Sequence, residues 1–141
     1  MYKSILLPID LEHDSSWEKS LPVAIELVQT FKGTLHLVAV VPRIGMAAVS
    51  LYLPEDFESK ALAHAAEQLH AFAVKQIPEG IRGDSHVAHG VIREEITKAA
   101  EKLDCDLIVM APHRPEMADF LISPATSYVV SHTKRSVLVV R

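Results

Sequence analysis

The sequence predicts an α/β protein with a five-stranded, mostly parallel sheet and helices on both faces. The first observation behind this prediction is a set of short apolar runs without polar alternation, which is typical of strands covered on both sides. The second is that segments with apolar residues at helical spacing separate these runs. Strands that alternate with helices require crossover connections, and these make neighbouring strands parallel.

The composition is that of one globular domain over residues 1–141, with 49% hydrophobic and 23% charged residues. The formal charge is −4 and no basic block occurs, so we expect no nucleic-acid partner. No window approaches the roughly 20 apolar residues of a membrane span, and the first residues lack the long apolar run of a signal peptide. A single cysteine, Cys105, fits a reducing compartment. We therefore expect a cytoplasmic protein without membrane insertion.

The first third of the chain is predicted to hold two strands and one helix. Ser4 to Ile9 is an apolar run rich in branched side chains, which favours a strand. The helix that follows is capped by residues 14–16 or, because a proline stands inside its first two turns, begins nearer Lys19. Gly33 ends this helix, and Thr34 to Val41 forms the second strand.

The middle of the chain adds a loop, two helices and a strand. Residues 43–54 are rich in small and apolar side chains, so we expect this loop to cover something. Pro54 begins a long helix that has acidic residues in its first turn and ends at Ile77. A short third strand is expected from Ser85 to His89, and a third helix from Ile92 to Leu103.

The last part of the chain contains the fourth and fifth strands. Asp106 to Ala111 is the fourth strand, a helix runs from Ser123 or Thr126 to His132, and Ser136 to Val140 is the fifth strand. The loops that leave strands one, two and four all lie at the carboxyl edge of the sheet, where such sheets bind ligands. The loop after the fourth strand opens a helix whose first backbone N–H groups are free, which makes an anion site.

Asp10 is a candidate functional residue because it stands at the carboxyl end of the first strand. The alternative is that its carboxylate only caps the turn before the first helix. A histidine metal site is not expected from the spacing of the histidines. His86 and His89 point to opposite faces of a strand, while His64 and His70 do not share a face of their helix.

Five stretches carry a resemblance to a known family: Ile5–Asp10, Leu35–Pro42, Gly90–Ile96, Asp106–Ala111 and Ser136–Arg141. Together they resemble the universal stress protein family of nucleotide-binding α/β proteins, over nearly the whole chain. The run from Ala111 to Pro115 is most similar to the F and G type, a short-loop branch with Ser-His-Arg-Pro there. The resemblance implies a doubly wound, Rossmann-like sheet with strand order 3-2-1-4-5.

Family members that bind ATP carry a Gly-x-x-Gly, about nine further residues, and then Gly-Ser/Thr. At these four motif positions the chain has Ala111, Arg114, Ser123 and Pro124, with a spacer one residue shorter. The missing glycines matter because backbone must approach the phosphates closely, and Pro124 lacks an N–H donor. Each lost hydrogen bond to a charged group costs roughly 1.5–3 kcal/mol, so we expect a weakened hold on the phosphates.

The resemblance implies an adenine nucleotide as ligand (ATP, ADP or AMP), with or without Mg²⁺. The backbone of Val40 would meet the adenine, and Asp10 would bind a ribose hydroxyl or, through water, a metal ion. The phosphates would meet charged side chains of the loop together with the N–H groups and hydroxyl at the start of the fourth helix. The implied nucleotide-binding residues are Pro8, Ile9, Asp10, Val40, Met110, Ala111, His113, Arg114, Ser123, Pro124, Ala125 and Thr126.

The fifth strand is expected at an edge of the sheet, with no charge to prevent it from pairing with another chain. The family pairs this strand with its copy, so the resemblance implies a homodimer through Val137, Leu138, Val139 and Val140. Two functions stay open. The first is a nucleotide-binding stress or regulatory protein with slow or no hydrolysis, because no base beyond Asp10 is evident. The second is a nucleotide-independent dimeric interaction protein of the same fold.

Overall fold

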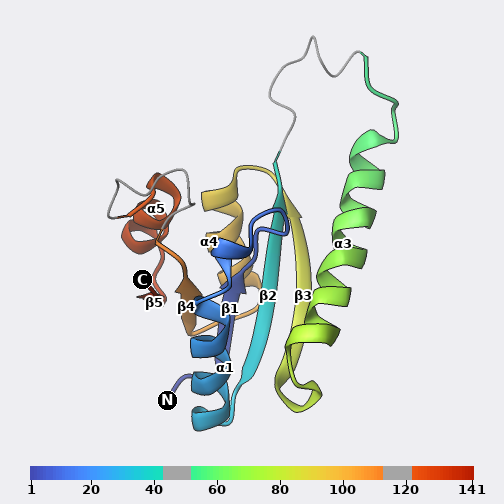
Figure 1. Cartoon of the computed structure of the whole chain (residues 1–141). Helices are drawn as coiled ribbons and strands as arrows, with labels where there is room; N and C mark the ends of the chain where they lie inside the picture. The colour runs from blue at the N-terminus through green and yellow to red at the C-terminus, as the bar shows by residue number, and fades with distance from the viewer. Residues whose placement is uncertain (43–51, 113–121) are drawn as a thin grey trace.

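The computed structural model describes residues 1–42, 52–112 and 122–141. Within them, one five-stranded sheet has the order β3-β2-β1-β4-β5, and every neighbouring pair of strands is parallel (Figure 1). This confirms the predicted fold class and strand order. The strands are β1 (Ser4–Pro8), β2 (Thr34–Val41), β3 (Arg82–His89), β4 (Leu107–Met110) and β5 (Ser136–Val139).

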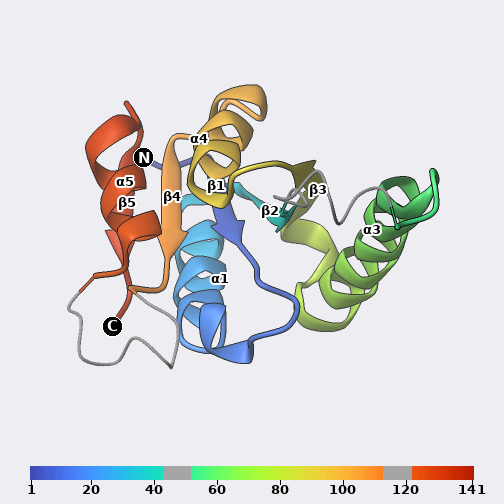
Figure 2. The same cartoon turned by 90° about the horizontal axis from the view of Figure 1, so that it is seen from above.

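Helices cover both faces of this sheet. In the view from above, α1 and α3 lie on one face and α4 and α5 on the other (Figure 2). The chain moves from β1 to β3 in one direction across the sheet and then continues with β4 and β5 on the other side of β1. Because each crossover is right-handed, this change of direction places the earlier and later helices on opposite faces. The described helices are α1 (Ser20–Phe31), α3 (Phe57–Gln76), α4 (Ile92–Lys102) and α5 (Pro124–His132), with 3₁₀ turns η1 (Asp14–Ser16) and η2 (Glu79–Ile81).

Alternate strand residues supply two hydrophobic cores, one on each face of the sheet. Leu7 and Leu37 pack with α1 and α3, while Leu6 and Ile108 pack on the face of α4 and α5. All four side chains are at most 1% exposed. Burial on both faces is the physical reason that these strands are continuously apolar rather than alternating.

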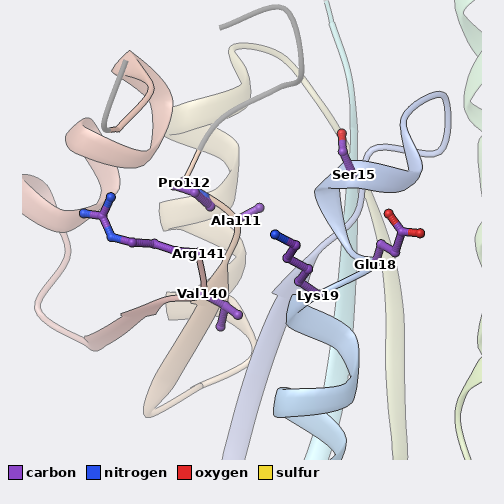
Figure 3. Close-up of a pocket in the computed structure, with 7 residues that line it drawn as sticks. All are labelled: Ser15, Glu18, Lys19, Ala111, Pro112, Val140 and Arg141. Carbon is purple, nitrogen blue, oxygen red and sulfur yellow. The ribbon is translucent and has the colours of Figure 1, made fainter. Parts of the chain in front are cut away.

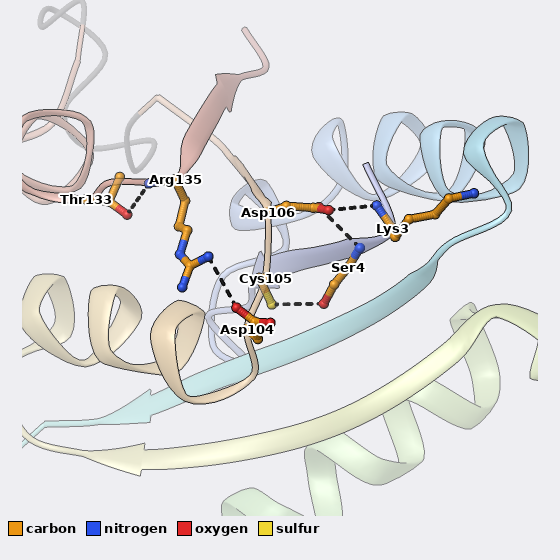
Figure 4. A network of polar contacts seen from close by, with 7 residues as sticks. All are labelled: Lys3, Ser4, Asp104, Cys105, Asp106, Thr133 and Arg135. Carbon is orange, nitrogen blue, oxygen red and sulfur yellow. Dashed lines mark hydrogen bonds and ion pairs between the residues drawn. The ribbon is translucent and has the colours of Figure 1, made fainter. Parts of the chain in front are cut away.

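At the amino-terminal edge of the sheet, polar contacts tie β1 to β4 (Figure 4). The Asp106 carboxylate accepts hydrogen bonds from the backbone N–H groups of Lys3 at 2.9 Å and Ser4 at 3.2 Å. Cys105, beside them, is free and buried, and burial raises the pKa of its thiol. A thiol with a raised pKa is a poor nucleophile, in agreement with a structural cysteine.

Some element boundaries differ from those predicted. α1 begins at Ser20, as its proline indicated, and residues 14–16 form the separate turn η1 instead of capping it. α3 begins at Phe57 rather than Pro54. The predicted covering loop, residues 43–54, falls mostly on residues 43–51, which are outside the described part of the chain.

β3 is longer than predicted, because it begins at Arg82 and not at Ser85. Its first residues are glycine and charged or polar residues, a composition that does not predict a buried strand. They pair with β2 across a register shift, where the Nδ1 atom of His36 accepts a hydrogen bond from the backbone N–H of Asp84 at 2.9 Å. Gly83 is required here, since a Cβ atom would stand 2.6 Å from His36 Nδ1. A side-chain acceptor thus extends the strand.

We expect the stability of the protein to fall as the pH drops below 6.5. Burial lowers the pKa of His36 from its ordinary 6.5, against the opposing charge of Asp84, and burial also lowers the pKa of His86. The unfolded chain therefore binds these protons more readily than the folded one. Stability is fully present above pH 6.5 and is lost as the pH falls through the lowered folded pKa values.

Urea unfolding at several pH values above and below 6.5 measures this effect. His36→Asn is the informative variant, because an amide oxygen can still accept from Asp84 but does not titrate. We expect a flatter dependence of unfolding free energy on pH in this variant, with His86 supplying the remainder. An unchanged slope would show that His36 does not contribute.

The turn after β1 also packs against α3. The ring of Trp17, which follows η1, meets the ring of Phe72 edge to face, with centroids 4.9 Å apart and an interplanar angle of 75°. Aromatic pairs in this geometry add stabilisation beyond the area they bury. This contact holds the turn in place between α1 and α3, next to the cleft described below.

Candidate functional site

The carboxyl ends of β1, β2 and β4 open into one cleft of about 1060 Å³, with α3, α4 and α5 adding walls. Figure 2 looks onto this edge of the sheet, where the strand order reverses between β1 and β4. Every predicted nucleotide-binding residue in the described part of the chain lines the cleft: Pro8, Ile9, Asp10, Val40, Met110, Ala111, Ser123, Pro124, Ala125 and Thr126. The other two, His113 and Arg114, lie outside the described residues.

Asp10 organises the turn that leaves β1. One oxygen of its carboxylate accepts from the backbone N–H of Glu12 at 3.0 Å, and the other lies 3.0 Å from Nδ1 of His13. The Ser16 hydroxyl accepts from the Asp10 N–H at 2.9 Å and donates to the Asp10 carbonyl at 3.2 Å. The Asp10 carboxylate therefore caps this turn. The same carboxylate lines the cleft, so its role in binding stays a prediction.

The same turn brings together groups that could hold a metal ion. Ligand atoms of Asp10, Glu12 and His13 all lie within 4.8 Å of one another. His13 forms no histidine pair within one strand or helix, and its partners here are carboxylates, so the spacing of the histidines did not point to it. Two carboxylates would suit Mg²⁺ or Mn²⁺, and an imidazole shifts the preference toward softer divalent ions.

The start of α5 is capped by its own side chains. The Ser123 hydroxyl oxygen accepts from the Thr126 N–H at 3.2 Å, and the Thr126 hydroxyl donates to the Ala111 carbonyl at 3.1 Å. Ser123 and Thr126 are 8% and 2% exposed. Two of the donors expected to meet phosphate are thus already engaged within the protein. Pro124 has no N–H. Among the first three residues of α5, Ala125 is therefore the one whose N–H remains available to a ligand.

Among the described residues, the walls of the cleft combine small side chains with the cation of Arg93. Ala61 and Ala65 of α3 leave space opposite the end of β2, and Gly90 lines the cleft with a φ of +152°. Arg93, at the start of α4, also lines it, and its guanidinium lies over the Tyr128 ring, 5.3 Å from the centroid. Sequence reasoning missed Arg93, because a charge in the first turn of a helix usually only faces solvent.

A second, smaller pocket of about 260 Å³ adjoins the cleft (Figure 3). Ser15 and Ala111 line both cavities, so the two share a boundary. The other residues that line the small pocket are Glu18, Lys19, Pro112, Val140 and Arg141. No sequence motif pointed to this pocket, because its residues come from three separate parts of the chain.

The predicted dimer residues lie on the free edge of the sheet. β5 is the last strand beside β4, and Val137 to Val139 belong to it while Val140 follows it. Leu138 is 37% exposed. The Val140 N–H donates to the Met110 carbonyl of β4, so by alternation the Val139 N–H faces away from β4. The edge position is confirmed, whereas pairing with a second copy stays a prediction.

Fold and site together define an α/β protein with a cleft at the switch point of a parallel sheet. The model of the universal stress protein family matches residues 1–141, and the chain belongs to this family. Universal stress protein G of Shigella flexneri is 31% identical over 145 residues, which covers 100% of both chains. Universal stress protein A homolog 1 of Coxiella burnetii is 27% identical, covering 99% of this chain and 96% of its own.

Solved structures share the fold. Universal stress protein UspA from Lactobacillus plantarum has a TM-score of 0.75 at 23% identity, covering 99% of this chain and 98% of its own. The family protein At3g01520 from Arabidopsis thaliana, with AMP bound, has a TM-score of 0.66 at 15% identity, covering 98% and 90%. The universal stress protein from Archaeoglobus fulgidus in complex with dAMP reaches 0.65 at 16%, covering 99% and 98%. None of the described helices combines the length and apolar character needed to cross a membrane.

Proposed function

We propose that this protein binds an adenine nucleotide (ATP, ADP or AMP), with or without Mg²⁺, and acts as a cytoplasmic stress-response or regulatory protein. The observation that carries the proposal is the cleft at the switch point, which is lined by every described residue that the family resemblance assigns to the nucleotide. Support also comes from structural neighbours that hold AMP and dAMP in the same fold. A nucleotide is a suitable ligand because the cleft joins apolar walls to an anion-favouring helix start.

In this proposal the two ends of the ligand meet different chemistry. The adenine lies against the end of β2, where Val40 offers backbone groups and the alanines of α3 leave space. The ribose lies near Asp10, whose carboxylate is fixed by the turn. The phosphates lie at the start of α5, where the positive end of the helix dipole and the Ala125 N–H favour an anion.

The self-capped start of α5 weakens the hold on phosphate in a specific way. A phosphate that takes the Thr126 N–H must first displace the Ser123 hydroxyl from it. A net exchange of one hydrogen bond for another gives little free energy, whereas an open N–H group would give roughly 1.5–3 kcal/mol with a charged partner. The base and ribose therefore carry a larger share of the affinity in this proposal.

The functional unit in this proposal is a homodimer formed through β5. No other described strand pairs with the outer edge of β5, the strand has no charged side chain, and Leu138 adds exposed apolar surface to it. An edge strand of this kind can pair with other chains and cause aggregation. Pairing two copies through β5 would cover both edges. The dimer requires no nucleotide, so it would form in either of the two candidate functions.

The first experiment is mass spectrometry of small molecules released on denaturing freshly purified protein. We expect an adenine nucleotide near one per chain, and its phosphate count shows what the altered loop holds. Ala61→Trp, which fills the cleft from α3, should remove the ligand. Ala66→Trp is the matched control, because Ala66 is exposed on the same helix and does not line the cleft.

The second candidate function is a nucleotide-independent dimeric interaction protein. The observation that favours it is the start of α5, where internal hydrogen bonds occupy donors that a phosphate would need. No released nucleotide, together with no heat when ATP and Mg²⁺ are titrated into the protein, would reject nucleotide binding. The dimer would then be the property that remains to explain.

A further inference from the structure

The small pocket beside the cleft is lined by a lysine and a serine whose side chains have no polar partner among the described residues. The Ser15 hydroxyl is buried and has no hydrogen-bond partner among the described residues. Lys19 stands four residues further along the chain. Its side chain makes no ion pair or hydrogen bond with any described residue. A buried donor without a partner carries a desolvation cost, and such a group needs an explanation.

The arrangement of these groups suits an anion. Figure 3 shows the amine of Lys19 reaching toward Ala111 and Pro112 across the opening of the pocket. The carboxylate of Glu18, the one acidic side chain among the described residues that line the pocket, turns away from this amine. An oxyanion between Lys19 and Ser15 would gain a charge partner and would accept from the hydroxyl.

The pocket lies next to the place where the phosphates are expected. Ala111 forms the boundary between the two cavities, and its carbonyl receives the Thr126 hydroxyl from the start of α5. A phosphate chain that leaves α5 therefore reaches the Ala111 boundary next. Alanine is small enough to let the chain cross, and Ser15 lines both cavities at the same boundary.

We infer that the Ser15–Lys19 pocket is a subsite for the terminal phosphate of a nucleoside diphosphate or triphosphate. The inference rests on the proposed function, since the base and ribose must occupy the cleft. In this arrangement Lys19 replaces part of the phosphate binding that the motif positions at α5 have lost. The subsite makes the protein prefer ADP and ATP over AMP, because a single phosphate ends before the boundary at Ala111.

The test is calorimetric titration of AMP, ADP and ATP into the wild type and four variants at one salt concentration. Lys19→Gln should weaken ADP and ATP about tenfold and leave AMP within about twofold, as loss of one charged hydrogen bond predicts. Lys19→Arg should retain the preference for ADP and ATP. Lys75→Gln removes the same charge from an exposed position in α3 and should change none of the three affinities.

Ser15→Ala gives an independent readout. It removes a buried hydroxyl without a partner, so the free protein should melt at the same or a higher temperature while ADP binds a few-fold more weakly. Loss of ADP affinity in a variant that melts no lower cannot come from misfolding.

The outcomes separate the two proposals. If AMP binds but Lys19→Gln changes AMP and ADP equally, or changes neither, the subsite is refuted and nucleotide binding stands. If none of the three nucleotides binds the wild type, the proposed function fails and the subsite fails with it.

Discussion

Leu138→Lys is expected to turn the proposed homodimer into a monomer, with dimer affinity reduced by a factor of about 100 or more. The reason is that a twofold axis through paired β5 strands brings residue 138 of both copies to the same interface. Two like charges would then be placed together where apolar side chains met, which costs several kcal/mol. Leu138 is 37% exposed in the single chain, so the fold of the monomer should tolerate the change.

Sedimentation equilibrium over a range of concentrations measures this effect. Val74→Lys is a matched control, because Val74 is an apolar residue 53% exposed on α3, which packs against β2 and β3 at the opposite end of the sheet from β5. The control variant should remain dimeric. A dimer of undiminished affinity in Leu138→Lys would reject the edge of β5 as the interface, and a monomeric wild type would reject the homodimer itself.

The double variant Ser123→Gly with Pro124→Ser is expected to bind ADP and ATP about ten to a hundred times more tightly. Glycine at 123 removes the hydroxyl that occupies the Thr126 N–H, and serine at 124 restores a backbone N–H and adds a hydroxyl. One or two new charged hydrogen bonds account for this range. Calorimetric titration with each nucleotide measures the gain.

The same double variant should lose about 0.5–1 kcal/mol of folding stability. Ser123 is the N-cap of α5 and Pro124 occupies a position at the helix start where proline is favoured, so both native residues stabilise the helix. Tighter binding together with lower stability would show that the native pair favours the fold over the ligand. Equal affinities in the variant and the wild type would contradict the assignment of this helix start to the phosphates.

The arrangement of the sheet could be predicted from the sequence because β1, β2 and β4 are mostly apolar and show no regular alternation with polar residues. A strand of this kind must be covered on both faces, and that requirement leads to crossover helices and a parallel sheet. β3 did not meet this condition, since Gly83 and Asp84 stand in its first half. Its start depends on the hydrogen bond between His36 and Asp84, residues 48 positions apart in the chain. Such a contact leaves no local pattern.

The candidate site could be predicted in part for the same reason. Topology alone placed Asp10 and Ala111 at one edge of the sheet. The hydrogen bonds within the site depend on side-chain geometry that no motif encodes. The Thr126 hydroxyl reaches a carbonyl 15 residues earlier, and it is this contact that takes a donor away from a ligand. The Ser15 hydroxyl is the reverse case, because it is buried and has no hydrogen-bond partner among the described residues.

The contact between Trp17 and Phe72 gives the protein a built-in optical signal. Trp17 is the single tryptophan of the chain and stands between the turn after β1 and α3, both of which border the cleft. Indole emission responds to small changes in the position and polarity of its surroundings. Any closure of α3 over an occupied cleft would move Phe72 relative to this ring. A shift of α3 relative to the turn after β1 can therefore be followed by intrinsic fluorescence, without a label.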